Sequence, residues 1–100
     1  MNVRAEGNTV RVTGLRDLDE ASGGELRQQV LDTIGSLRDR VEVDLSQTRS
    51  ISACGLGALV YLQKACGNVC LLNPLAPVRQ ILELARMDRI FEIVESEARP

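Results

Sequence analysis

The sequence of 100 residues contains no histidine and no tryptophan, and its aromatic residues are one tyrosine and one phenylalanine. Without histidine, the chain lacks the Ser-His-Asp and Cys-His pairs that most often activate a nucleophile. The phosphate-binding pattern of nucleotide hydrolases is also absent, and Gly55-Leu56-Gly57 lacks the third glycine of a dinucleotide-binding fingerprint. We therefore expect no catalytic residue and no enzymatic activity.

Basic residues are too few for a nucleic-acid partner, because 12 lysines and arginines stand against 14 acidic residues, for a formal net charge of -2. The scarcity of aromatic rings also leaves no platform on which bases could stack. No apolar run approaches the roughly 18 residues that span a membrane, so we expect no direct membrane insertion. Charged residues near Met1 occupy the place of a signal peptide's apolar region, and we expect a cytoplasmic protein.

Cysteine is present three times, as Cys54, Cys66 and Cys70, each among apolar neighbours. The odd number and the expected compartment predict buried, reduced thiols rather than disulfides. A metal site at Cys66-x-x-x-Cys70 is disfavoured, since the chain has no histidine and only one further cysteine. We expect no metal and no cofactor.

The length predicts one domain over residues 1–100, with a frayed tail at 95–100. Alternating valines predict a strand at 9–13, which Gly7-Asn8 joins to a short strand at 2–6 as a hairpin. Further strands are predicted at 41–45, at 69–72, where the apolar run suits a strand buried on both faces, and at 90–94.

Three helices are predicted between these strands. The first begins with a capping box at Ser22 and Glu25 and ends at Gly35. The second runs from Gly55 to Cys66, and the third begins near Pro77. The order β-β-α-β-α-β-α-β predicts an α/β fold in which a mixed, mostly parallel sheet of about five strands packs with three or four helices.

The segment Ile51-Ser52-Ala53-Cys54-Gly55-Leu56-Gly57 lies where a strand is expected to end and a helix to begin. The carboxyl ends of parallel strands and the amino-terminal ends of helices are frequent binding sites. Small residues also permit a tight strand-to-helix turn with no function of its own. Composition and spacing alone leave both interpretations open.

The stretch Val41-Glu42-Val43-Asp44-Leu45-Ser46 through Ile51-x-x-x-Gly55-Leu56-Gly57-x-Leu59 resembles the STAS domain, the family of bacterial anti-sigma-factor antagonists. Leu72-Asn73-Pro74-x-x-Pro77-Val78 and the opening segment Val12-Thr13-Gly14-Leu15-Arg16-Asp17-Leu18-Asp19 resemble other parts of the same family. The resemblance covers most of the chain and implies a STAS-like single domain.

The resemblance implies a protein switch. In this family the unmodified antagonist binds an anti-sigma factor, often a serine kinase, and so releases a sigma factor for transcription. Phosphorylation of a serine or threonine in the turn before the helix ends the complex. Alignment on the two glycines puts Ser52 where the family has aspartate, Ala53 at the phosphoacceptor and Cys54 at the next small polar position. Because alanine has no hydroxyl, the switch is lost or moved, with Ser52 as the alternative acceptor.

The residues expected to bind the partner come from the turn and from an earlier loop: Ser52, Ala53, Cys54, Gly55, Leu56, Gly57, Leu15 and Asp17. On this interpretation, Gly55→Arg or Leu56→Asp abolishes capture of the partner without unfolding the chain. Two other functions remain open. One is a STAS subunit that binds the ATPase of a lipid-transporting ABC complex and needs no regulatory serine. The other is a ligand-sensing module, for which the sequence defines no pocket.

Overall fold

A computed structural model describes residues 1–34 and 40–95 of the chain. In this part of the chain a five-stranded sheet has the order β1-β2-β4-β6-β7. Its strands are β1 (Asn2–Glu6), β2 (Thr9–Thr13), β4 (Arg40–Asp44), β6 (Val69–Leu72) and β7 (Glu92–Val94). Only the β1–β2 pair is antiparallel, so the prediction of a mixed, mostly parallel sheet is confirmed.

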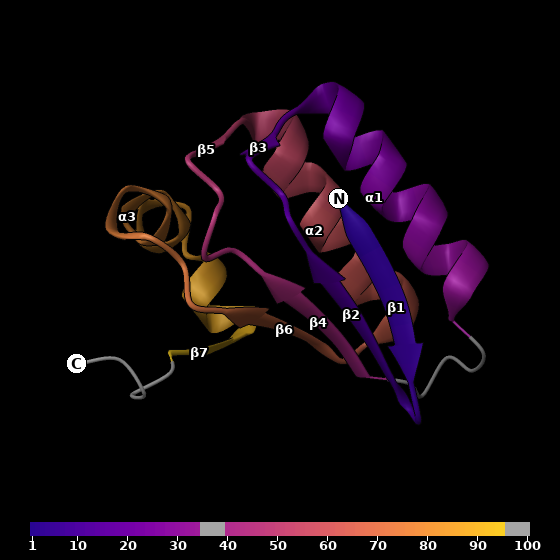
Figure 1. Cartoon of the computed structure of the whole chain (residues 1–100). Helices are drawn as coiled ribbons and strands as arrows, with labels where there is room; N and C mark the ends of the chain where they lie inside the picture. The colour runs from indigo at the N-terminus through magenta and orange to yellow at the C-terminus, as the bar shows by residue number, and fades with distance from the viewer. Residues whose placement is uncertain (35–39, 96–100) are drawn as a thin grey trace.

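The helices are α1 (Glu20–Thr33), α2 (Ala53–Cys66) and α3 (Ala76–Leu84), followed by the short 3-10 helix η1 (Met87–Arg89). Helices α1 and α2 lie side by side against one face of the sheet, and α3 lies near its other end (Figure 1). A second, two-stranded parallel ladder joins β3 (Asp17–Leu18) to β5 (Ser50–Ile51). Two residues are too few to show an alternating pattern, so the sequence does not predict the bounds of either strand, although a strand was expected to end near Ile51.

The core lies between the sheet and the two helices. Alternation in β2 and β4 turns their valines toward the helices, where Val10, Val12, Val41 and Val43 are at most 1% exposed. Leu26 of α1 and Leu59 of α2 are fully buried against them. Burial of each such side chain stabilises the fold by about 1.5–3 kcal/mol. The prediction that β6 is buried on both faces is also confirmed, since Cys70 and Leu71 are both 0% exposed.

The predicted start of the first helix is wrong by about one turn. Asp19 is the N-cap of α1, because its carboxylate accepts a hydrogen bond from the Ser22 backbone N–H at 3.1 Å. The Ser22 hydroxyl in turn accepts one from the Asp19 N–H at 2.9 Å, which completes a capping box without Glu25. The helix ends at Thr33, and the predicted end at Gly35 lies outside the described residues.

Other boundaries shift by one or two residues. Helix α2 begins at Ala53 instead of Gly55, and it ends as predicted before Gly67, whose φ of 77° suits a glycine C-cap. Helix α3 begins at Ala76, so Pro77 lies in its first turn as predicted. The last strand begins at Glu92 instead of Ile90, because the N–H groups of Ile90 and Phe91 both donate to Met87 O and extend the turn of η1. Of the predicted frayed tail, residues 96–100 lie outside the described part.

Candidate protein-docking site

The turn from β5 into α2 is fixed by backbone and side-chain hydrogen bonds. Ser52 is the N-cap of α2, and its Oγ accepts a hydrogen bond from the Gly55 N–H at 3.2 Å. The Ser52 N–H donates to Leu18 O at 2.9 Å, which ties the start of the helix to β3. The small residues therefore serve a tight turn, and they also leave the first turn of α2 without bulky side chains.

The β3–β5 ladder brings together the two segments that are predicted to form one docking surface. It pairs Asp17 with Ser50 and Leu18 with Ile51. Beside it, the Arg49 N–H donates to Arg16 O at 2.7 Å. The loop near Leu15 and the turn at Ser52 are thus neighbours in space although they lie far apart in the sequence.

Asp17 is the charged centre of this junction. Its carboxylate accepts a hydrogen bond from the Ser50 hydroxyl at 2.7 Å and forms an ion pair with Arg49 Nη2 at 3.2 Å. The Ser50 hydrogen bond is the main cause that lowers the pKa of Asp17, and the charge of Arg49 acts in the same direction. Arg49 and Ser50 were not predicted as site residues, since a short polar loop carries no pattern that would single them out.

The predicted docking residues divide into a surface group and a supporting group. Ala53, Cys54 and Gly57 are exposed, as is Ser52, and the Asp17 side chain is 45% exposed. Leu15, by contrast, is 2% exposed, and Leu56 packs partly buried against the core. These two residues hold the surface in place instead of forming it.

Gly55 is buried, and the expectation that Gly55→Arg leaves the fold intact is wrong. A Cβ at this position would lie 2.2 Å from Leu18 O and 2.9 Å from Leu18 Cγ. Glycine is needed here because β3 crosses the first turn of α2 at contact distance. Any side chain at position 55 must displace one of the two elements.

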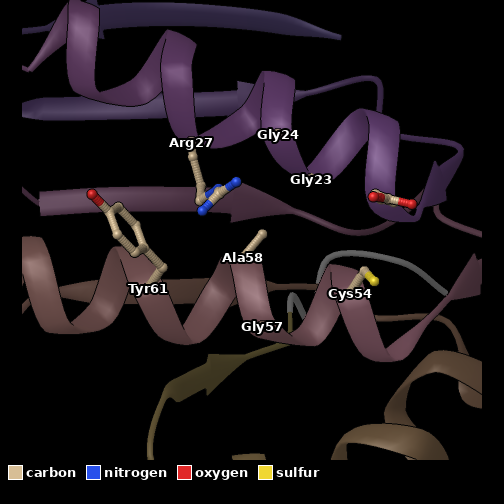
Figure 2. Close-up of a pocket in the computed structure, with 8 residues that line it drawn as sticks. Gly23, Gly24, Arg27, Cys54, Gly57, Ala58 and Tyr61 are labelled. Carbon is tan, nitrogen blue, oxygen red and sulfur yellow. The ribbon is translucent and has the colours of Figure 1, made fainter.

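A groove of about 400 Å³ continues from this surface between α1 and α2 (Figure 2). The two helices run in the same direction and approach closely at Gly23, where an added Cβ would lie 3.1 Å from the Cβ of Ala58. At one end of the groove the Arg27 guanidinium lies 5.2 Å from the centre of the Tyr61 ring. The groove is lined by Glu20, Gly23, Gly24, Arg27, Cys54, Gly57, Ala58 and Tyr61. No local pattern in the sequence predicts this groove, because its walls come from two helices, α1 and α2, that are separate in the chain.

The prediction that all three cysteines are buried is correct for Cys66 and Cys70 and wrong for Cys54, which is exposed. Cys54 lies in the first turn of α2, where β3 covers the side of the helix that carries Gly55, and its thiol points to the groove (Figure 2). The described residues contain no group of three or more side chains placed to hold a metal ion. Among the same residues, no helix is both long enough and apolar enough to cross a membrane.

Comparison with known proteins assigns the family. The sequence model described as "Mlab, STAS domain" matches residues 1–95, and the chain therefore belongs to the STAS domain family. The resemblance noted around Gly55 is thereby confirmed over nearly the whole length. The sequence matches none of the curated proteins with which it was compared.

Solved structures share the fold. The crystal structure of a candidate anti-sigma factor antagonist from Thermotoga maritima, TM1081, has a TM-score of 0.80 and 22% identity, covering 97% of this chain and 86% of that chain. The NMR structure of TM1081 has a TM-score of 0.78 and 23% identity, and the match covers 94% of this chain and 79% of that chain. The structure of the anti-sigma factor antagonist SpoIIAA in its unphosphorylated form has a TM-score of 0.73 and 12% identity. This match covers 97% of this chain and 88% of that chain. At these identities the similarity establishes the fold alone.

Proposed function

We propose that this domain is an anti-sigma-factor antagonist that binds an anti-sigma factor or serine kinase and so regulates transcription, without catalysing a reaction itself. The observation that carries the proposal is an exposed, uncharged amino-terminal end of α2 in a chain of the STAS family. The similar folds of SpoIIAA and TM1081 support it. We also propose that the domain acts in the cytoplasm, where it would meet such a partner.

The docking surface would have an uncharged centre and a polar rim. Ala53, Cys54 and Gly57 supply a centre with no charge to desolvate, while the paired Asp17 and Arg49 lie beside it. Protein interfaces commonly combine a centre depleted of charge with a hydrated, polar rim. Leu15, Gly55 and Leu56 would act from beneath, by holding the turn in the shape that the partner recognises.

We further propose that this domain has lost the phosphorylation switch at its usual position. Ala53 is the first residue of α2 and has no hydroxyl to accept a phosphoryl group. Ser52 is exposed and remains the alternative acceptor, but its Oγ already caps the helix. A phosphate there would add about -1.5 to -2 charges and keep oxygens near the helix N–H groups, so it would disturb docking more than folding.

A STAS subunit that binds the ATPase of a lipid-transporting ABC complex is the second candidate. Two observations favour it: the matching family model is described by the name Mlab, and Ala53 suits a domain that needs no regulatory serine. The same docking surface would serve either partner, so the identity of the captured protein distinguishes the two.

The test is affinity capture from the native cell extract with the whole chain as bait and identification of the bound proteins by mass spectrometry. Ala53→Arg places a long cation at the centre of the docking surface. Ala76→Arg is the matched control, because Ala76 is also an exposed alanine at the first position of a helix. Truncating or charging the centre of an interface typically costs about 2 kcal/mol or more, so we expect at least a tenfold loss of capture for Ala53→Arg alone.

The outcomes separate the hypotheses. An anti-sigma factor or serine kinase captured by the natural chain and by Ala76→Arg, but not by Ala53→Arg, supports the antagonist. An ATPase and permease with the same dependence support the transport subunit instead. Equal capture by both variants would refute the assigned surface. If a captured kinase transfers phosphate from ATP to Ser52, the switch has moved and is not lost.

A further inference from the structure

Strand β1 forms one edge of the five-stranded sheet, and its outer side is not paired with any described strand. Figure 1 shows β1 in indigo as the last strand on that side, with α1 drawn next to it. An edge strand exposes a row of unpaired backbone groups that can pair with another chain. Proteins usually protect such an edge with proline, a bulge, a covering element or charged side chains. Strand β1 contains no proline and pairs with β2 in an unbroken register, and its charged residues are Arg4 and Glu6.

The direction of the backbone groups in β1 follows from its neighbours. The Arg40 N–H donates to Asn8 O, so the even-numbered residues of β2 turn their backbone groups toward β4. Its odd-numbered residues therefore face β1, as the pairing of Thr9 with Glu6 across the two-residue turn requires. The N–H and C=O groups of Val3 and Ala5 consequently point away from β2, toward the open edge.

The side chains on the open face of β1 carry complementary charges. Arg4 and Glu6 are both exposed, and neither forms an ion pair with another described residue. Arg4 lies opposite Arg11, which is itself bound to Glu42 at 2.7 Å, so the residue directly across from Arg4 on β2 carries a like charge. The charge of Glu6 acts on the Arg11 guanidinium only through space, without an ion pair between the two side chains.

We propose that β1 pairs with β1 of a second copy of this chain, antiparallel and around a two-fold axis at Ala5. In this register Arg4 of each copy lies opposite Glu6 of the other, which gives two cross-strand pairs of opposite charge. A two-fold axis at Arg4 would place the two Arg4 side chains opposite each other, and an axis at Val3 would place Arg4 opposite Asn2. Charge complementarity therefore selects Ala5.

The proposed pairing extends the sheet continuously across both copies and uses none of the exposed residues of α2. It is independent of the proposed docking function, and a failure of either leaves the other standing. Because the paired segment is short, the interface is far smaller than that of a permanent dimer, and association should be weak and dependent on concentration.

Sedimentation equilibrium of the purified chain, from about 10 µM to about 1 mM, tests this proposal. We expect the average mass to rise from 11.0 kDa toward twice that value. Ala5→Pro removes an outward N–H but no hydrogen bond between β1 and β2, so it should weaken association about tenfold or more. Ala5→Val keeps the N–H and is the matched control. Circular dichroism verifies that each variant is folded.

A charge exchange tests the register without altering the backbone. Arg4→Glu and Glu6→Arg should each weaken association several-fold, because each brings like charges together, and the double variant should restore it. A mass of 11.0 kDa at every concentration would overturn the proposal. A dimer that is indifferent to Ala5→Pro and to both charge reversals would overturn it equally, and a double variant that stays as weak as the single ones would overturn the register.

Discussion

At the scale of single residues, two glycines of the same helix have opposite environments. A Cβ on Gly55 would lie 2.2 Å from the carbonyl oxygen of Leu18, whereas a Cβ on Gly57 would meet no atom within 4 Å. Gly55 is required by the crossing of β3 and α2. Gly57 has no such role within this chain, and glycine inside a helix costs about 1 kcal/mol relative to alanine.

The substitutions Gly55→Ala and Gly57→Ala should therefore change stability in opposite directions. Gly55→Ala forces β3 away from α2 and should lower the free energy of unfolding by about 2 kcal/mol or more. Gly57→Ala should raise it by about 0.5–1 kcal/mol through helix propensity. Urea unfolding followed by circular dichroism measures both. A neutral Gly55→Ala would contradict the close approach of Leu18.

The three thiols should also differ in reactivity. Cys54 is exposed, while Cys66 and Cys70 are buried, and burial raises the pKa of Cys70, which further reduces its thiolate fraction. We expect a chromogenic disulfide reagent to titrate about one thiol per folded chain quickly and all of them in urea. Cys54→Ser should remove the fast phase, and a fast phase that persists in this variant would show that another thiol is accessible.

At the scale of elements, an ionic row crosses the open face of the sheet from β2 to β7. The Glu42 carboxylate of β4 accepts hydrogen bonds from Arg11 Nη2 at 2.7 Å and from Arg40 Nε at 2.9 Å, and Arg40 also reaches Glu92 at 3.3 Å. Burial is the largest single influence on the pKa of Glu42 and raises it, but the two arginines together outweigh burial and lower the pKa. The ionised form of Glu42 therefore stabilises the folded sheet.

The contribution of this ionic row should be visible in how the free energy of unfolding depends on pH. Because the pKa of Glu42 is lower in the folded state, its contribution is present above the ordinary glutamate pKa of about 4.3 and is lost as the pH falls through the lowered value. Glu42→Gln should cost on the order of 1 kcal/mol at pH 7 and much less in acid. Urea unfolding of both proteins across this pH range gives the difference, and a cost that is the same at every pH would exclude an ionic origin.

Elements with a clear period were predictable. Alternating valines located β2 and β4, and the unbroken apolar run located β6. The start of α1 was harder to predict, because the sequence offers two possible capping boxes, Asp19 with Ser22 and Ser22 with Glu25. Only the hydrogen bonds of the structure show that Asp19 and Ser22 form the real one. The start of β7 depends on the turn of η1, which is set by packing.

At the scale of the whole molecule, one core connects the three helices with the central strands of the sheet. Buried side chains from β2, α1, β4, α2, β6 and α3 form a single cluster, which predicts one cooperative unit. Tyr61, the only tyrosine, reports on the contact between α1 and α2 through Arg27.

Urea unfolding of the dilute protein should therefore be two-state. The transition followed by Tyr61 fluorescence should coincide with that followed by far-UV circular dichroism, with a slope of about 1 kcal/mol/M or somewhat more. Midpoints that differ would show that the two helices separate before the sheet unfolds. In that case the groove between them would belong to a less stable part of the domain.

The fold class, the order of the main elements and the family could be predicted from the amino-acid sequence alone, because they follow from hydrophobic periodicity and from a motif that is local in the chain. The sequence also located the turn before α2, since Ser52 and the glycines lie close together in sequence.

Which of these residues reach the surface depends on how the helices and strands pack in three dimensions. Gly55 and Cys54 are adjacent in the chain, yet β3 covers the first and leaves the second exposed. The contact of Asp17 with Ser50 and Arg49 depends on a two-residue ladder between distant segments. Such contacts are set by how elements cross in space, and a chain of residues read in order contains no local pattern that encodes them.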